Sequence, residues 1–121
     1  MRFQRDVPVR GAYDVCVVGG GPAGMAAAVT AARQGRRVYL AEALGCMGGL
    51  GTAGGVPLFM TFGDGIHFHA EGFGREVLDR HGAEGVIHDG PRYINAERLK
   101  RIYDDQLGEA GVAFSFFTEL I

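Results

Sequence analysis

The order of apolar and polar residues predicts a strand, a helix and a second strand near the start of the chain. The apolar run Val15–Val18 is typical of a strand that is buried on both faces of a parallel sheet. The alanine-rich stretch Ala23–Gln34 predicts a helix with a thin face for close packing, and Gly35 predicts its end. A second strand is expected at Val38–Ala41.

Two amphipathic helices and a third strand are expected further along the chain. The helices are predicted at Glu71–His81 and at Ala96–Glu109, where Asn95 is a suitable N-cap. The strand is predicted at Val112–Phe117. The residues expected on the buried helix faces are Phe73, Val77, Leu78, Leu99, Ile102, Tyr103 and Leu107. Strands that alternate with helices predict an α/β fold with a parallel sheet.

Glycines between the first predicted strand and helix form a G-x-G-x-x-G pattern at Gly19, Gly21 and Gly24. In this pattern the first glycine allows a tight turn, the second lets the backbone approach a pyrophosphate, and the third lets the helix pack closely on the strand. Pro22 suits the first turn of a helix, where a missing N–H costs nothing. The pattern and its context predict a Rossmann-like dinucleotide-binding unit; the alternative is an ordinary βαβ unit with a glycine-rich turn.

An acidic residue completes the predicted unit. Glu42 follows Gly24 by 18 positions, close to the spacing of about 20 at which a carboxylate meets the ribose hydroxyls of a dinucleotide. A carboxylate there accepts hydrogen bonds from the ribose and repels a 2′-phosphate, so a ligand of the NADP type is disfavoured.

Composition limits the functions that need to be considered. The chain has 121 residues, 47% of them hydrophobic, which suits one domain with a core, and its net charge of −2 gives no electrostatic case for nucleic acid or an anionic membrane. No apolar run reaches membrane-spanning length, and residues 1–12, expected as a solvated arm, lack the apolar core of a signal peptide. Two cysteines without disulfide or metal spacing suit a reducing cytoplasm.

A second glycine-rich segment follows Glu42, at residues 45–55. Its small side chains would let it lie flat against an extended ligand and offer backbone N–H groups to phosphate, ribityl or ring oxygens. A flexible surface loop is the alternative. The segment and its surroundings are too apolar for a solvated linker, because they include Cys46, Met47, Leu50, Val56 and Leu58.

These motifs together carry a family resemblance. The strand with Val-Val-Gly-Gly-Gly-Pro-Ala-Gly, the helix end Ala-Ala-Arg-x-Gly, the acidic Glu42 and the segment Gly-x-x-Gly-Gly-x-x-Thr-x-Gly resemble the FAD-dependent oxidoreductases. These belong to the two-dinucleotide-binding-fold flavoproteins, with the glutathione reductase and fumarate reductase types. The resemblance implies FAD, with its pyrophosphate on Gly19–Gly24 and its adenosine ribose on Glu42. The cofactor-binding residues that it implies are Gly19, Gly21, Pro22, Ala23, Gly24, Glu42, Ala43, Gly48, Gly49 and Thr52.

Other residues with reactive side chains remain open to interpretation. His67 and His69, with Glu71, invite a metal hypothesis, but no further ligand is fixed by spacing, so we predict no metal and expect surface or substrate-side histidines. A histidine beside a flavin could also be a general acid or a site of covalent attachment. Cys46 is expected to be a small buried hydrophobe, with a redox role facing the flavin as the alternative. The sequence identifies no catalytic residue.

The sequence therefore predicts the FAD-binding portion of a flavin-dependent oxidoreductase, acting on a small-molecule substrate or electron carrier. Residues 13–121 are expected to be the N-terminal part of a Rossmann-like FAD-binding domain, and the sheet to be truncated. The expected partner is the rest of the flavoprotein, as a longer chain or another subunit, because a three-stranded parallel sheet with open edges is a poor free-standing solution. Two alternatives remain: an NAD(H)-binding domain, which the second glycine segment disfavours, and a non-catalytic remnant.

Overall fold

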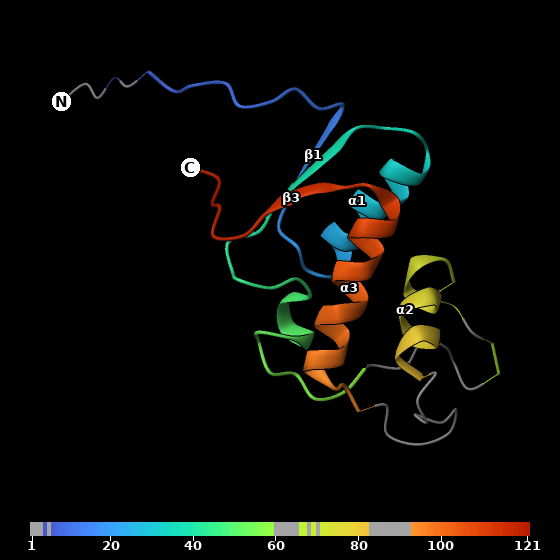
Figure 1. Ribbon diagram of the computed structural model, residues 1–121. Helices are drawn as coiled ribbons and strands as arrows, with labels where there is room; N and C mark the ends of the chain where they lie inside the picture. Colours follow the sequence, from blue (N-terminus) through green and yellow to red (C-terminus); the bar gives the residue numbers. More distant parts are fainter. Residues whose placement is uncertain (1–3, 5, 60–65, 68, 70, 83–92) are drawn as a thin grey trace.

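The structure is a small α/β fold with one parallel sheet (Figure 1). The computed structural model describes residues 4, 6–59, 66–67, 69, 71–82 and 93–121. The elements, in chain order, are β1 (Val15–Val18), α1 (Pro22–Arg33), β2 (Val38–Ala41), a 3-10 turn at Gly49–Gly51, α2 (Phe73–Gly82), α3 (Ala96–Ala110) and β3 (Ala113–Ser115). The predicted Rossmann-like arrangement of strand, helix and strand is confirmed.

The three strands are parallel and lie in the order β1-β2-β3. Val15 of β1 pairs with Val38 of β2, and Tyr39 of β2 pairs with Ala113 of β3. Helix α1 packs against β1 and β2, α3 packs against α1, and α2 packs against α3. The core between them contains Met25, Ala28, Val29, Val38, Leu40, Met47, Val77, Leu99, Tyr103, Leu107 and Val112. All three strands therefore bring their carboxyl ends to the same edge of the sheet.

One expectation about the sheet is wrong. The first strand is not buried on both faces, because Cys16 is exposed and Val18 is 52% exposed. Helix α1 covers the other face, and within the described ranges no element lies over these two side chains. Tyr39, which pairs with Cys16, stacks its ring on that of Tyr13 at 5.2 Å. An apolar run shows only that a strand is compatible with burial on both faces. Whether a second layer covers it depends on other parts of the protein.

The predicted helices and strands shift by one or two residues at their ends, and the physical signals explain the shifts. Helix α1 starts at Pro22 rather than Ala23, because a proline lacks the N–H that a first turn cannot use. Helix α3 is capped as expected, since the side chain of Asn95 accepts a hydrogen bond from the Arg98 amide at 3.0 Å. It ends at Ala110, and the next residue, Gly111, caps it with a left-handed φ of 70°. The third strand is shorter than the predicted Val112–Phe117.

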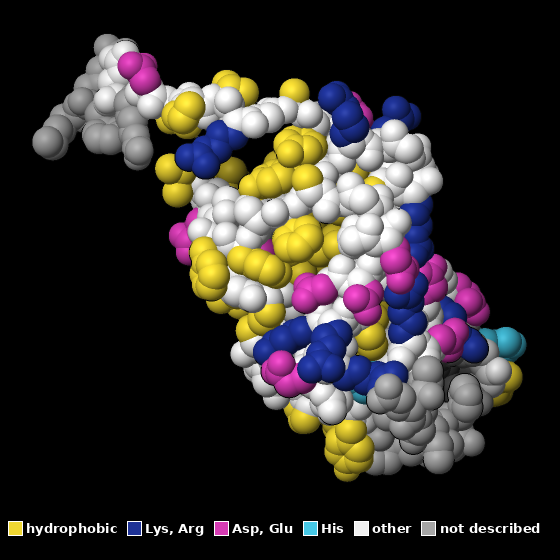
Figure 2. All heavy atoms as spheres, viewed as in Figure 1, with side chains coloured by type: hydrophobic (Ala, Val, Ile, Leu, Met, Phe, Trp, Pro, Cys, Tyr) yellow, Lys and Arg dark blue, Asp and Glu magenta, His cyan; other side chains and the backbone are white. Residues whose placement is uncertain are grey.

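Charged side chains of both signs alternate over α2 and α3 on the face shown in Figure 2. Two ion pairs link neighbouring helices: Arg33 of α1 with Glu76 of α2 at 2.8 Å, and Arg80 of α2 with Glu109 of α3 at 2.6 Å. These pairs are solvent-exposed, so each stabilises the fold only modestly. None of the helices in the described part of the chain is long and apolar enough to cross a membrane. Most of the predicted loop 82–93 and part of the segment 59–70 lie outside the described residues.

Candidate functional site

The first glycine turn connects β1 to α1 at the carboxyl edge of the sheet. Gly19 donates its N–H to the Ala41 carbonyl at 2.8 Å and has a φ of 96°, which favours glycine. A Cβ added at Gly19 or at Gly21 would meet nothing within 4 Å. A Cβ added at Gly24 would instead collide with the Gly19 carbonyl oxygen. Two of the fingerprint glycines therefore border open space, and the third lets the helix touch the turn.

The N-terminus of α1 opens at the same place. Its N-cap is Gly21, which forms no side-chain cap, and the first turn contains no acidic residue. The first amides of a helix lack partners within the helix and carry the positive end of its dipole. Pro22 and Ala23 of this turn are exposed. A helix start that is neither capped nor neutralised is a suitable site for a phosphate group.

Glu42 follows β2 directly and lies beside the glycine turn. It is buried, with 7% of its surface exposed. One carboxylate oxygen, Oε2, accepts a hydrogen bond from the Gly20 amide at 2.5 Å, and Oε1 accepts one from the Leu44 amide at 2.7 Å. A carboxylate offers about four acceptor positions, so further donors such as ribose hydroxyls can still bind. The two amides fix the orientation of the side chain, and the neighbouring Ala43 is exposed.

The second glycine segment packs directly onto the first. Gly48 donates its N–H to the Gly20 carbonyl at 2.8 Å, and a Cβ on Gly49 would approach the Gly21 Cα at 3.3 Å. Met47 is completely buried, and a Cβ on Gly20 would collide with its sulfur. The segment therefore packs against the glycine turn and is not a solvated linker, as its apolar residues, Met47 among them, predict. Gly20 was not among the predicted site residues, although a third consecutive glycine was a visible signal.

Thr52 has a structural bond in this loop. It is buried, and its hydroxyl donates to the Met47 carbonyl at 2.6 Å. The sulfur of Cys46, which is half-buried, lies 3.9 Å from the same hydroxyl. The Thr52 side chain therefore holds the loop closed. A ligand could contact Thr52 through the lone pairs of its hydroxyl oxygen or through its backbone.

The metal hypothesis gains no support. The rings of His67 and His69 are 6.1 Å apart. Within the described ranges there is no group of three or more His, Cys, Asp or Glu side chains that could hold a metal ion.

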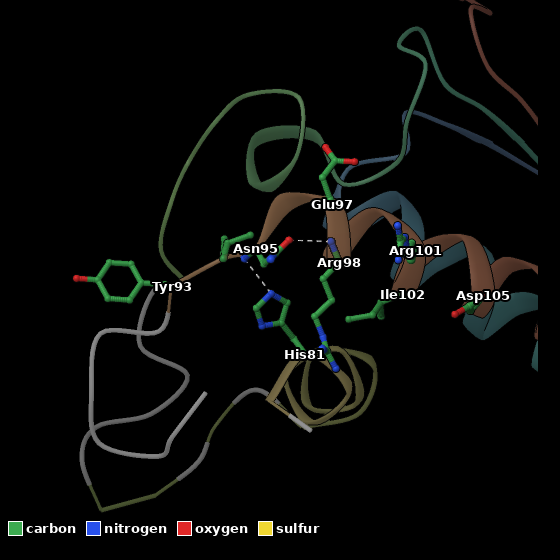
Figure 3. Close-up of a pocket in the computed structure, with 9 residues that line it drawn as sticks. His81, Tyr93, Asn95, Glu97, Arg98, Arg101, Ile102 and Asp105 are labelled. Carbon is green, nitrogen blue, oxygen red and sulfur yellow. Dashed lines mark hydrogen bonds between the residues drawn. The ribbon is translucent and has the colours of Figure 1, made fainter. Parts of the chain in front are cut away.

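A cavity of about 790 Å³ lies away from this site, between the last turn of α2 and the first turns of α3 (Figure 3). His81 borders it and is buried with 2% of its surface exposed. Its Nε2 accepts a hydrogen bond from the Asn95 amide at 3.1 Å, and burial, with the nearby charge of Arg98, lowers the pKa of its imidazole. Sequence analysis took His81 as a helix end, although its spacing of four from Val77 places it on the same buried face. None of the residues described as lining the cavity belongs to the glycine turn.

Comparisons with known proteins agree with this geometry. The chain is 47% identical over 47 residues to dihydrolipoyl dehydrogenase of Trypanosoma brucei brucei. The matched segment covers 39% of this chain and 10% of that enzyme. The crystal structure of THI4 from Thermovibrio ammonificans is similar with a TM-score of 0.58 and 27% identity, over 86% of this chain and 37% of that one. The crystal structure of AlpK, at 20% identity, shares the fold with a TM-score of 0.56, over 90% of this chain and 24% of that one.

The chain therefore spans a tenth of the curated relative and just over a third of the THI4 chain. Residues 14–121 match the family model described as FAD dependent oxidoreductase. That range includes both glycine segments, Glu42 and all three strands. The resemblance noted in the sequence is confirmed, as is FAD as the cofactor of the family: the chain belongs to the FAD dependent oxidoreductases.

Proposed function

We propose that this chain is the FAD-binding portion of a flavin-dependent oxidoreductase. Residues 13–121 form the N-terminal part of its FAD-binding domain, and residues 1–12 form an arm that precedes it. The observation that carries the proposal lies at the carboxyl ends of β1 and β2, where Gly19 and Gly21 border open space and the buried carboxylate of Glu42 bonds to the Gly20 amide between them. FAD, when bound, supplies hydride or electron transfer through its flavin ring.

The pyrophosphate of the cofactor fits the start of α1. Backbone amides there are not capped by a side chain, and glycines allow close approach. The adenosine ribose fits Glu42, whose carboxylate is already oriented by the amides of Gly20 and Leu44. The full set of residues that we assign to the cofactor is Gly19, Gly21, Pro22, Ala23, Gly24, Glu42, Ala43, Gly48, Gly49 and Thr52.

FAD is preferred to NAD(H) because of the second glycine segment. A plain NAD domain has no reason to follow its acidic residue with such a segment, whereas here Gly48 is bonded to Gly20 and Gly49 lies against Gly21. The segment thus adds a second stretch of backbone with little side-chain bulk next to the glycine turn. Such a surface suits the ribityl chain and ring edge of a flavin.

The remaining parts of the enzyme are proposed to lie outside these residues. The short coverage of longer relatives supports a partner region, in the same polypeptide or in another subunit, that contacts the small-molecule substrate or electron carrier. We propose a cytoplasmic location, in keeping with the two free cysteines.

The proposal is tested by binding. The folded chain is incubated with excess FAD or NADH, the unbound ligand is removed by gel filtration, and the visible and fluorescence spectra of the protein fraction are recorded. We expect retained flavin absorbance and no retained NADH. The Gly21→Val variant should lose the flavin while keeping its circular dichroism spectrum, and Ala27→Val, on the exposed side of α1, should retain it. Retention of NADH but not FAD, or of neither by the folded chain, would show the proposal to be wrong.

A further inference from the structure

Phe117 occupies a backbone conformation that its side chain disfavours. Its φ is 52°, and among the described residues it is the one non-glycine with a positive φ. Bulky residues rarely adopt this left-handed region, and such outliers gather where surrounding structure holds them for function. Here the surroundings do hold it, because the Phe117 amide donates to the Leu44 carbonyl at 3.3 Å and the Thr118 amide donates to the Glu42 carbonyl at 2.9 Å.

The strained backbone presents the ring to solvent. Phe117 is 82% exposed, whereas its neighbour Phe116 packs against the core. The tip of the Phe117 ring lies close to Gly45, since a Cβ added there would be 2.8 Å from the ring Cζ. The ring therefore stands over the backbone that follows Glu42, and the fold buries little apolar surface in return for the strained conformation.

The strand order places this ring where the base of a nucleotide would lie. The glycine turn that suits the pyrophosphate follows β1, the ribose-binding Glu42 follows β2, and Phe117 follows β3. In a nucleotide the base and the phosphates are attached at opposite ends of the ribose. A ribose held at the tip of β2 with its phosphates toward β1 thus directs its base toward β3.

We propose that Phe117 is a base-stacking residue, which offers its ring to the adenine of the dinucleotide. The inference rests on the proposed function and adds to it a side chain that contributes affinity at the adenine end of the site. Aromatic rings stack on bases without needing a particular hydrogen-bond pattern, and loss of one such contact by truncation typically weakens binding by about tenfold or more. The left-handed backbone turns the side chain out of the core and toward this end of the site.

The test measures the dissociation constants of FAD and ADP for the wild-type chain and for variants of Phe117. ADP contains the adenine, ribose and pyrophosphate but no flavin, so it reports on this end of the site alone. We expect Phe117→Leu to weaken both ligands by about tenfold, and Phe117→Tyr, which keeps the ring, to bind both as the wild type does. Phe114→Leu is the matched control, because Phe114 is a half-exposed aromatic of β3 before the strand end, and it should bind both ligands unchanged.

A second variant separates ligand contact from structure. Phe117→Gly accepts the positive φ without strain, so its thermal midpoint should be no lower than that of the wild type, while its affinity for FAD and ADP falls. Wild-type affinity in Phe117→Leu would overturn the inference, as would a loss of affinity matched by an equal loss in Phe114→Leu. If the wild-type chain binds neither FAD nor ADP, the proposed function itself fails and this inference fails with it. If it binds both and Phe117→Leu binds equally well, only this inference fails.

Discussion

The two glycines that flank the start of α1 should respond in opposite ways to the same substitution. Gly21→Ala and Gly24→Ala each add one methyl group to the fingerprint. At Gly21 that methyl would meet nothing within 4 Å, whereas at Gly24 it would collide with the carbonyl oxygen of Gly19. The structure therefore predicts that Gly24→Ala damages the fold and that Gly21→Ala damages only the binding of the cofactor.

The cost at Gly24 follows from what the methyl would meet. An alanine inside a helix is normally more stable than a glycine by about 1 kcal/mol. Overpacking in a closely packed region costs about 1–3 kcal/mol, and the upper end applies because the obstructing atom is backbone. The Gly19 carbonyl belongs to a turn that is fixed by the bond from the Gly19 amide to Ala41. The net expectation for Gly24→Ala is a loss of about 2 kcal/mol from the free energy of unfolding.

The effect at Gly21 has the opposite sign. Its φ of −67° and ψ of 178° are extended values that alanine adopts without strain. A Gly→Ala change at such a position stabilises by about 0.4–1 kcal/mol, chiefly through the unfolded chain. The same methyl projects into the open space that we assign to the pyrophosphate, so the affinity for FAD should fall.

Urea unfolding of the ligand-free chain, followed by far-ultraviolet circular dichroism, measures the difference. The two variants should differ by about 2–3 kcal/mol, which at ordinary urea slopes separates their midpoints by about 1 M. Equal midpoints would refute the argument, because the contact of Gly24 with Gly19 would then not constrain the turn. Unchanged FAD affinity in Gly21→Ala would refute the placement of the pyrophosphate.

Two further predictions concern buried polar side chains of the helices. Burial lowers the pKa of His81 from its ordinary 6.5. The unfolded chain therefore takes up a proton at this residue at a higher pH than the folded chain does. The free energy of unfolding is unaffected above pH 6.5 and falls as the pH drops from 6.5 toward the native pKa, by up to about 1.4 kcal/mol per pH unit. The free energy of unfolding, measured from pH 7.5 to 5, should no longer show this slope in His81→Gln. The control His67→Gln changes an exposed histidine and should keep the slope. An unchanged slope in His81→Gln would contradict the prediction. Gln106 is fully buried, and neither polar atom of its side-chain amide has a hydrogen-bond partner among the described residues. Gln106→Met should therefore raise the free energy of unfolding by about 1 kcal/mol. The control Gln34→Met, at an exposed position, should change that free energy by less than about 0.5 kcal/mol. Thermal or urea unfolding checks this, and a destabilised Gln106→Met would mean that the amide is satisfied after all.

The sequence predicted the elements of this fold well because their signals are local. The apolar run before Gly19, the alanines of α1 and the cap at Asn95 each act within a few residues, so the sequence alone is enough to predict the elements that they form. The role of Gly24 is also predictable from the sequence, because the third glycine of this motif is the one that lets the helix pack closely on the turn.

Other features depend on residues far apart in the chain, and sequence alone did not reveal them. The burial of Met47 under Gly20 and the bond from Gly48 to Gly20 join segments almost thirty residues apart. The left-handed Phe117 is set by bonds to residues that follow another strand, and nothing in the run Phe-Ser-Phe-Phe indicates which aromatic residue turns outward. The exposed face of β1 was mispredicted for a related reason, because an apolar strand does not say whether a second layer is present.

The chemistry of the groups at the glycine turn indicates what this part of the protein contributes. Backbone amides, glycines and the carboxylate of Glu42 meet there, and both oxygens of Glu42 already accept hydrogen bonds from amides. A carboxylate held in this way has free acceptor positions for hydroxyl groups. The His81 imidazole, whose pKa is shifted, borders the separate cavity between α2 and α3. In the proposed assignment, the groups at the glycine turn bind and orient a dinucleotide.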